Sequence, residues 1–239
     1  MNLVLDIGNT FAKVALIQDK EIFFSKSYKE LTLKNLDAIL SCYSPQKAIA
    51  SIVGKIRPEL INLIRSRITT IILDQNTPIP LKNQYNTPET LGYDRIAVAV
   101  AANSLYPNRN VLIIDAGTAI TYELVTSDAV YLGGAISPGI SLRFNALNSH
   151  TAKLPLLEKV ENYPLIGQNT SECILSGVLN GVIGEIDAYI DNVKNIYPIE
   201  TVLTGGDSNF LVDKLKNSIF VNQNLMTIGL NKILEFNLG

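Results

Sequence analysis

The sequence is poor in the residues from which most metal centres and catalytic triads are built. His150 is the single histidine, and Cys42 and Cys173 stand alone, without the close spacing of a metal-binding pair. We therefore expect neither a histidine-based metal centre nor a Ser-His-Asp triad, and a carboxylate is the expected general base. Two isolated cysteines suit a reducing compartment, so the expected location is cytoplasmic.

Excess charge and long apolar runs are also scarce. The 239 residues carry a net charge of −2, and no strongly basic stretch marks a nucleic-acid-binding face. The longest strongly apolar run, Ile96 to Ala102, is far shorter than the ~20 residues of a membrane-spanning helix. Asp6 follows so closely on the first residue that no signal peptide is expected. We expect binding to neither nucleic acid nor a membrane.

The order of apolar segments indicates an α/β fold. Hydrophobic residues make up 47% of the chain, enough for a sizeable core. Strand-like and helix-like segments alternate, as in α/β proteins. Strands are expected at 3–6, 11–17, 22–25, 48–53, 70–73, 111–114, 120–125, 129–132 and 201–203, and helices at 33–40, 58–67, 96–105, 140–147, 171–193 and 226–236. The Pro-rich stretch 74–90 is expected to be a surface loop.

An acidic, glycine-containing turn occurs twice. Asp6-Ile-Gly-Asn-Thr ends the first strand, and Asp115-Ala-Gly-Thr-Ala ends the strand that opens the second half. In both halves the turn is followed by a strand, a hairpin turn and another strand. We therefore predict two duplicated domains over residues 1–107 and 108–239, and the last helix could pack back on the first domain.

A D-x-G turn at the end of an apolar strand suits phosphate binding. Glycine lets a phosphate approach the backbone, and the following Asn or Thr adds hydrogen-bond donors. The carboxylate can hold a hydrated cation that shields phosphate oxygens. Strand alternation places Lys13 where its amine can reach a β- or γ-phosphate. For one copy, a plain β-hairpin with a capped turn is an equal explanation, whereas two copies favour an ATP site.

Five separate blocks carry a resemblance to a known family. They are Asp6–Lys13, Gly92–Arg95, Asp115–Thr121, Gly133–Gly139, and Asn169-Thr170 ahead of Ser176-Gly177. In their order and spacing they resemble type III pantothenate kinases, which belong to the acetate and sugar kinase/Hsc70/actin superfamily. The resemblance implies two duplicated actin-like, ribonuclease H-like domains with an ATP cleft between them. It also implies phosphorylation of pantothenate to 4′-phosphopantothenate, the first step of coenzyme A biosynthesis.

The resemblance also implies a role for individual residues. ATP, with Mg²⁺, is expected to contact Asp6, Ile7, Gly8, Asn9, Thr10, Phe11, Ala12, Lys13 and Thr118. Pantothenate is expected to contact Tyr85, Gly92, Tyr93, Asp94, Arg95 and Thr170. Asp115 is expected to bind a monovalent cation, K⁺ or NH₄⁺. Thr170 would reach pantothenate from the partner subunit of a homodimer.

Asp94 is the expected general base. Phosphorylation of an alcohol needs an acceptor for the hydroxyl proton, and an Asp has this role in other kinases. Arg95 suits the pantothenate carboxylate, because its guanidinium offers a fork of donors. From the residues alone, a helix cap paired with Arg95 explains Asp94 equally well. Likewise, Asn169-Thr170 suits a helix N-terminus, and Tyr85 suits a loop aromatic packed on its domain.

Three other functions remain open at the level of sequence. A different small-molecule kinase of the superfamily would keep both acidic turns. A non-catalytic transcription accessory factor is disfavoured by the acidic pI near 5.5 and by Asp94. An actin-like filament is disfavoured because 239 residues leave little room for polymerisation insertions. The apolar stripe expected on helix 171–193 is wide enough for a dimer partner, although a core role alone is the commoner explanation.

Overall fold

The chain forms two compact units. The computed structural model describes residues 1–8, 11–53 and 57–239. The first unit comprises Met1–Leu105 and Asn224–Gly239, and the second comprises Tyr106–Gln223. The predicted division after residue 107 lies close to this boundary. The last helix, which the prediction counted in the second domain while allowing it to pack on the first, lies in the first unit.

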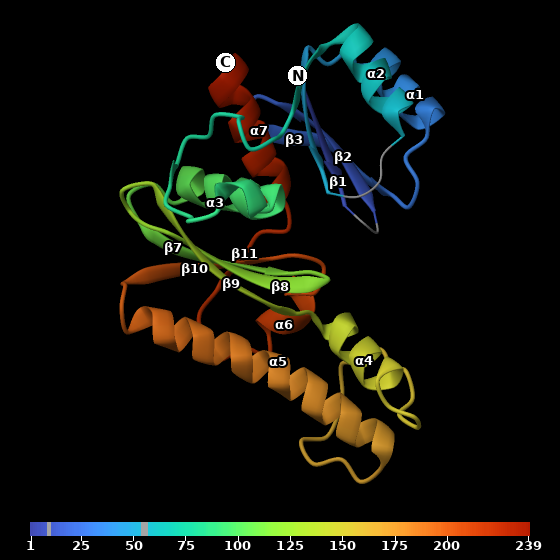
Figure 1. Ribbon diagram of the computed structural model, residues 1–239, viewed down its shortest axis with the longest axis vertical. Helices are drawn as coiled ribbons and strands as arrows, with labels where there is room; N and C mark the ends of the chain where they lie inside the picture. The colour runs from blue at the N-terminus through green and yellow to red at the C-terminus, as the bar shows by residue number, and fades with distance from the viewer. Residues whose placement is uncertain (9–10, 54–56) are drawn as a thin grey trace. The chain divides into compact units, whose positions relative to one another are not determined.

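The first unit contains a five-stranded sheet in the order β3-β2-β1-β4-β5, and Figure 1 shows β1, β2 and β3 in blue. Its strands are β1 (Asn2–Ile7), β2 (Ala12–Gln18), β3 (Glu21–Tyr28), β4 (Lys47–Ile52) and β5 (Thr69–Ile72). Its helices are α1 (Leu33–Tyr43), α2 (Pro58–Arg67), α3 (Tyr93–Leu105) and α7 (Leu225–Leu238). The Pro-rich stretch predicted as a loop also contains a two-residue strand, β6 (Lys82–Asn83), and a 3-10 helix, Pro88–Thr90.

Helices cover both faces of this first sheet. Alternate residues of β1, among them Leu3 and Leu5, enter a core that also includes Leu36 of α1 and Ile64 of α2. The opposite face of β1 and β4 packs against α7, which in turn packs along α3. A Cβ atom added at Gly229 of α7 would lie 1.8 Å from the carbonyl oxygen of Ala97 in α3. The two helices therefore meet backbone to backbone.

The second unit repeats this topology. Its strands are β7 (Asn110–Ala116), β8 (Ala119–Val125), β9 (Val130–Pro138), β10 (Ile199–Thr204) and β11 (Phe220–Val221), in the order β11-β10-β7-β8-β9. Its helices are α4 (Ile140–Ser149), α5 (Thr170–Lys194) and α6 (Ser208–Val212). β7 is antiparallel to β8 and parallel to β10, as β1 is antiparallel to β2 and parallel to β4. The predicted α/β fold of duplicated domains is confirmed.

The prediction that the third strand of the second half ends at Leu132 is wrong. β9 continues through the glycine pair to Pro138. Glycine weakens an ordinary strand, which is why the sequence indicated an end there. In the sheet, however, Gly134 lies opposite Glu123, and a Cβ atom added to it would lie 1.6 Å from the carbonyl oxygen of Tyr122. The close approach of β8 therefore requires glycine inside the strand.

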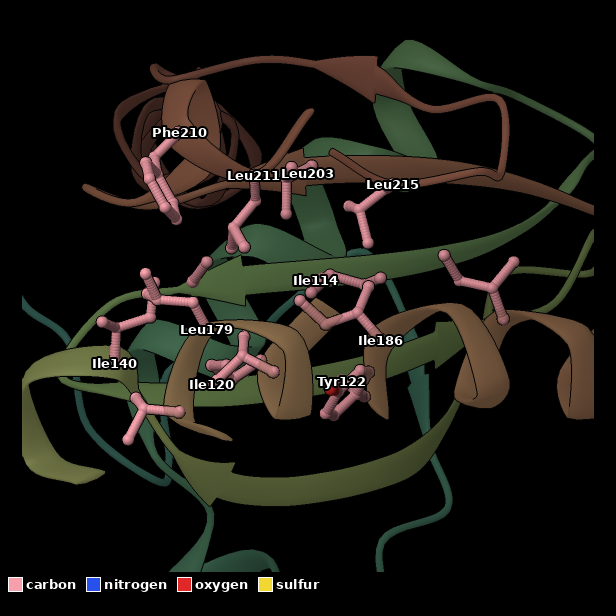
Figure 2. Packing of buried hydrophobic residues seen from close by; sticks show 14 of the residues in the cluster. Ile114, Ile120, Tyr122, Ile140, Leu179, Ile186, Leu203, Phe210, Leu211 and Leu215 are labelled. Atoms are coloured by element: carbon pink, nitrogen blue, oxygen red, sulfur yellow. The ribbon is translucent and has the colours of Figure 1, made fainter. Parts of the chain in front are cut away.

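Helix α5 forms the core of the second unit. It is long and apolar enough to cross a membrane by length and composition alone. Its apolar residues at helical spacing, however, are enclosed by the unit, and Leu179 and Ile186 are both 0% exposed. Figure 2 shows Ile186 beside Ile114 and Tyr122 of the sheet, and Leu179 near Ile120 and Ile140. We therefore interpret α5 as a core helix.

Candidate active site

The first acidic turn joins β1 to β2. The backbone N–H of Gly8 donates to the carbonyl oxygen of Phe11 at 3.0 Å, which closes the turn. Strand pairing sets Asp6 directly opposite Lys13, so the carboxylate and the amine share one face of the sheet. Ile7 and Ala12 belong to the core on the other face, so only their backbone groups could meet a ligand.

Phe11 and Gly8 are the other predicted residues of this turn that the structure describes. Phe11 is half exposed, at 49%. A Cβ atom added at Gly8 would find its nearest neighbour 3.5 Å away, which leaves the approach to the backbone open. Asn9 and Thr10 lie outside the described residues. Among the residues described, Asp6, Lys13 and the backbone of Gly8 are the groups of this turn that could contact a phosphate or its cation.

Burial disfavours the charged forms of both Asp6 and Lys13. Burial first, and then the charge of Asp94, raise the pKa of the Asp6 carboxyl to about 6, against an opposing effect of Lys13. Burial also lowers the pKa of the Lys13 amine, and Asp6 counteracts this. A bound cation would relieve the repulsion between Asp6 and Asp94. One or two carboxylates with substrate phosphates are a donor set that suits Mg²⁺.

Asn224 is a residue of this site that the sequence did not indicate. It precedes α7 and occupies the N-cap position, yet its side chain makes no capping hydrogen bond. Instead, Lys13 Nζ donates to Asn224 Oδ1 at 3.2 Å. An amide oxygen can hold an ammonium group in place without neutralising it.

Asp94 lies in the first turn of α3, which begins three residues earlier than the predicted start at Ile96. Asp94 Oδ1 accepts a hydrogen bond from the backbone N–H of Arg95 at 2.8 Å. Gly92 makes room for this arrangement, because a Cβ atom there would lie 2.4 Å from Asp94 Oδ1. The helix-terminus role and a catalytic role can therefore coexist, since Asp94 is exposed and retains a second carboxylate oxygen.

The structure brings Tyr85 and Arg95 together. Arg95 is only 7% exposed, and its guanidinium carbon lies 5.4 Å from the centre of the Tyr85 ring. Such a cation–π contact fixes the plane of the guanidinium group. The Pro-rich loop and the start of α3 thus form one patch, which also includes Gly92 and the half-buried Tyr93. These are four of the residues expected to contact pantothenate.

The second acidic turn is one residue tighter than the first. The backbone N–H of Gly117 donates to the carbonyl oxygen of Ala119 at 3.0 Å. Here Asp115 lies opposite Thr121, which occupies the position that Lys13 has in the first unit. Thr118 is exposed at the tip of the turn. In this turn, therefore, a hydroxyl residue stands opposite the aspartate in place of the lysine of the first turn.

Two glycine blocks converge on the second turn. The backbone N–H of Gly139 donates to the carbonyl oxygen of Thr118 at 3.0 Å. A Cβ atom added at Gly139 would lie 2.2 Å from the carbonyl oxygen of Gly117. Gly205 has a φ of +92°, and a Cβ atom there would lie 2.5 Å from Asp115 Oδ1. Both positions therefore require glycine, because their backbone packs too closely against the second turn for a side chain. Among the described residues, no group of three or more His, Cys, Asp and Glu side chains could hold a metal ion alone.

Thr170 lies elsewhere in the second unit, at the start of α5. Asn169 caps this helix by accepting from the backbone N–H of Glu172 at 3.0 Å, as the sequence indicated. Thr170 is exposed and lines an open pocket of about 980 Å³, with apolar walls that include Leu147 and Ile174 and with Arg143 at its edge. Thr170 therefore borders this pocket, whose lining does not include the described residues of the second acidic turn.

Comparisons with known proteins identify the family. A sequence model described as type III pantothenate kinase matches residues 2–192. The chain is 46% identical to the type III pantothenate kinase of Christiangramia forsetii over 99% of both chains. It is 42% identical to that of Bacteroides fragilis over 100% of this chain and 99% of the relative.

Solved structures support the fold. A Baf family protein from Campylobacter jejuni covers 98% of both chains with a TM-score of 0.61 at 24% identity. Component A of the (R)-2-hydroxyglutaryl-CoA dehydratase of Acidaminococcus fermentans covers 99% of this chain and 96% of its own, with a TM-score of 0.51 at 13% identity. At these identities only the fold is shared. The family model and the curated relatives show that the chain belongs to the type III pantothenate kinases, as its motifs indicated.

Proposed function

We propose that this chain transfers the γ-phosphoryl group of ATP to pantothenate, giving 4′-phosphopantothenate and ADP as the first step towards coenzyme A. The observation that carries the proposal is the grouping of Asp6, Lys13, Asp94 and Arg95 within the first unit. It combines a phosphate-binding turn with an exposed carboxylate and a buried guanidinium group.

Asp94 acts as the general base. Its free oxygen accepts the proton of the primary hydroxyl of pantothenate while that oxygen attacks the γ-phosphorus in line and ADP leaves. Asp94 is suited to this, because its other oxygen is held by the Arg95 backbone N–H at 2.8 Å. The carboxylate is therefore oriented before substrate binds.

Arg95 and Tyr85 orient the acceptor. The Arg95 guanidinium binds the carboxylate of pantothenate through paired N–H donors. Tyr85 packs on this guanidinium and restricts its plane. Gly92 and Tyr93 border the same patch, and Thr170 is proposed to complete it from the partner subunit of a homodimer. The exposed position of Thr170 and the open pocket beside it support that proposal.

The nucleotide phosphates bind at the acidic turns. The backbone of residues 7–12 and the Lys13 ammonium group contact them at the first turn, and Thr118 contacts them at the second. Mg²⁺, held by Asp6, would neutralise developing charge on the phosphate oxygens. Asp115 is proposed to hold K⁺ or NH₄⁺, supported by its position at the second acidic turn, opposite the hydroxyl residue Thr121. The proposed location of the reaction is the cytoplasm.

A comparison of acceptors tests this function directly. The protein is incubated with ATP and Mg²⁺, with and without K⁺, and with pantothenate, a panel of sugars or acetate, and products are identified by mass spectrometry. We expect phosphorylation of pantothenate alone, with a higher rate in K⁺. Phosphorylation of a sugar in its place would assign the chain to another activity of the same superfamily. Salt-dependent retention on DNA without any phosphorylated product would favour the accessory-factor alternative.

A further inference from the structure

Ser51 lies beside Asp6 in the first sheet. β4 runs parallel to β1, and their register pairs Ser51 with Asp6, while β2 pairs Lys13 with the other side of Asp6. Side chains at paired positions point to the same face of a sheet. Lys13, Asp6 and Ser51 therefore form a row across three neighbouring strands, on the face opposite to the core that α1 and α2 cover.

The hydroxyl of Ser51 is buried without a hydrogen-bond partner. The residue is 0% exposed, and within the described part of the chain nothing lies within bonding distance and geometry of its Oγ atom. A buried polar group without a partner destabilises a fold, and such a group in a native protein often has a catalytic role or an ordered ligand. Alanine has nearly the same shape without this cost, so the presence of serine calls for an explanation.

Asp6 is within reach of this hydroxyl. Paired residues on neighbouring strands are about 4.8 Å apart, a gap that the Ser and Asp side chains can close by rotation about χ1. A hydroxyl group that donates to one carboxylate oxygen would fix the orientation of the carboxylate and leave its other oxygen for a ligand.

We propose that Ser51 is a positioning residue for Asp6. When the nucleotide and its cation occupy the first turn, the Ser51 hydroxyl donates to one oxygen of the Asp6 carboxylate and leaves the other directed at the ligand. This proposal rests on the binding of ATP at that turn. The second unit has the same arrangement, because the buried hydroxyl residue Thr204 of β10 is paired with Asp115 of β7.

Two variants that remove a buried hydroxyl test the proposal. Thr201 Oγ1 is the matched control, because it is also buried without a partner among the described residues, yet it is paired with Leu112, three residues before the Thr204–Asp115 pair. We expect both Ser51→Ala and Thr201→Val to raise the melting temperature by a few degrees. Only Ser51→Ala should weaken binding of a non-hydrolysable ATP analogue with Mg²⁺, by about tenfold in calorimetry.

A double-mutant cycle shows whether Ser51 acts through Asp6. In an Asp6→Asn background, Ser51→Ala should cause no further loss of affinity for the analogue. Equal affinities of Ser51→Ala and the wild-type protein would overturn the proposal, as would a fall in melting temperature, which would show that the hydroxyl already has a partner in the free protein. Calorimetry separates this result from the proposed function, since a wild-type protein that binds the analogue but does not phosphorylate pantothenate still tests Ser51.

Discussion

The Asp6→Asn substitution should make the protein more stable, although it removes the carboxylate of the first acidic turn. Burial and the Asp94 charge raise the pKa of Asp6 from 3.8 to about 6. A difference of about 2.2 pH units corresponds to about 3 kcal/mol that the ionised carboxylate costs the folded state at neutral pH. Asparagine has the same shape and carries no charge. The effect of Lys13 is already included in this figure, because Lys13 opposes the rise in pKa.

The pH dependence identifies the cause of this stabilisation. Because the folded-state pKa lies above the unfolded value, the folded protein binds the extra proton between pH 4 and pH 6, and the contribution of Asp6 to stability falls as the pH rises through this window. The free energy of unfolding of Asp6→Asn should therefore equal that of the wild type near pH 4. At pH 7 and above, the free energy of unfolding of Asp6→Asn should exceed that of the wild type by up to about 3 kcal/mol.

Urea unfolding at a series of pH values measures this difference. Asp128→Asn is the control, because Asp128 is an exposed carboxylate in the turn between β8 and β9. The stability difference of the control should not change between pH 4 and pH 7. A pH-independent difference for Asp6→Asn, or a loss of stability at pH 7, would refute the account of Asp6 as a carboxylate that burial holds in a costly charged state.

Three further predictions concern helix packing and the two substrates. Gly229→Ala should destabilise the protein by at least about 1–3 kcal/mol in urea unfolding, because its Cβ atom would lie 1.8 Å from the Ala97 carbonyl oxygen. At Gly184 of α5, an added Cβ atom would meet no described atom within 4 Å beyond its own helix backbone. Gly184→Ala should therefore stabilise the protein by about 1 kcal/mol. Asn224→Ala should raise the KM for ATP by about tenfold, because Lys13 loses its amide partner, whereas Asn237→Ala at the other end of α7 should leave it unchanged. Arg95→Lys should raise the KM for pantothenate and not that for ATP, because lysine lacks the paired donors.

The sequence predicted the features that depend on local patterns. Apolar runs and turns located the two acidic turns, the hairpins and most helices, and their repetition predicted the duplicated fold. Local sequence patterns gave a wrong strand end where contact with a neighbouring strand determines which residue fits. The glycine pair at 133–134 indicated the end of a strand, yet the close approach of the Tyr122 carbonyl oxygen makes glycine necessary inside β9.

The candidate site was predictable in part for the same reason. The motifs indicated Asp6, Lys13 and Asp94, because each belongs to a short continuous block. Ser51 and Asn224 carry no such signal, since their positions come from strand register and from helix packing. The pairing of β4 with β1 sets Ser51 beside Asp6, and Asn224 reaches Lys13 through a contact that spans 211 positions. Neither position can be inferred from one chain without its tertiary structure.

The rate of pantothenate phosphorylation by Asp94→Asn tests the central claim most directly. Asparagine keeps an oxygen that can accept from the Arg95 backbone N–H, so α3 should remain folded, which circular dichroism checks. Glu89→Gln is the control, because it neutralises an exposed carboxylate in the 3-10 helix just before α3. We predict that kcat falls about 10²–10⁴-fold in Asp94→Asn and stays normal in Glu89→Gln. Near-normal turnover by a folded Asp94→Asn protein would contradict the assignment of Asp94 as the general base.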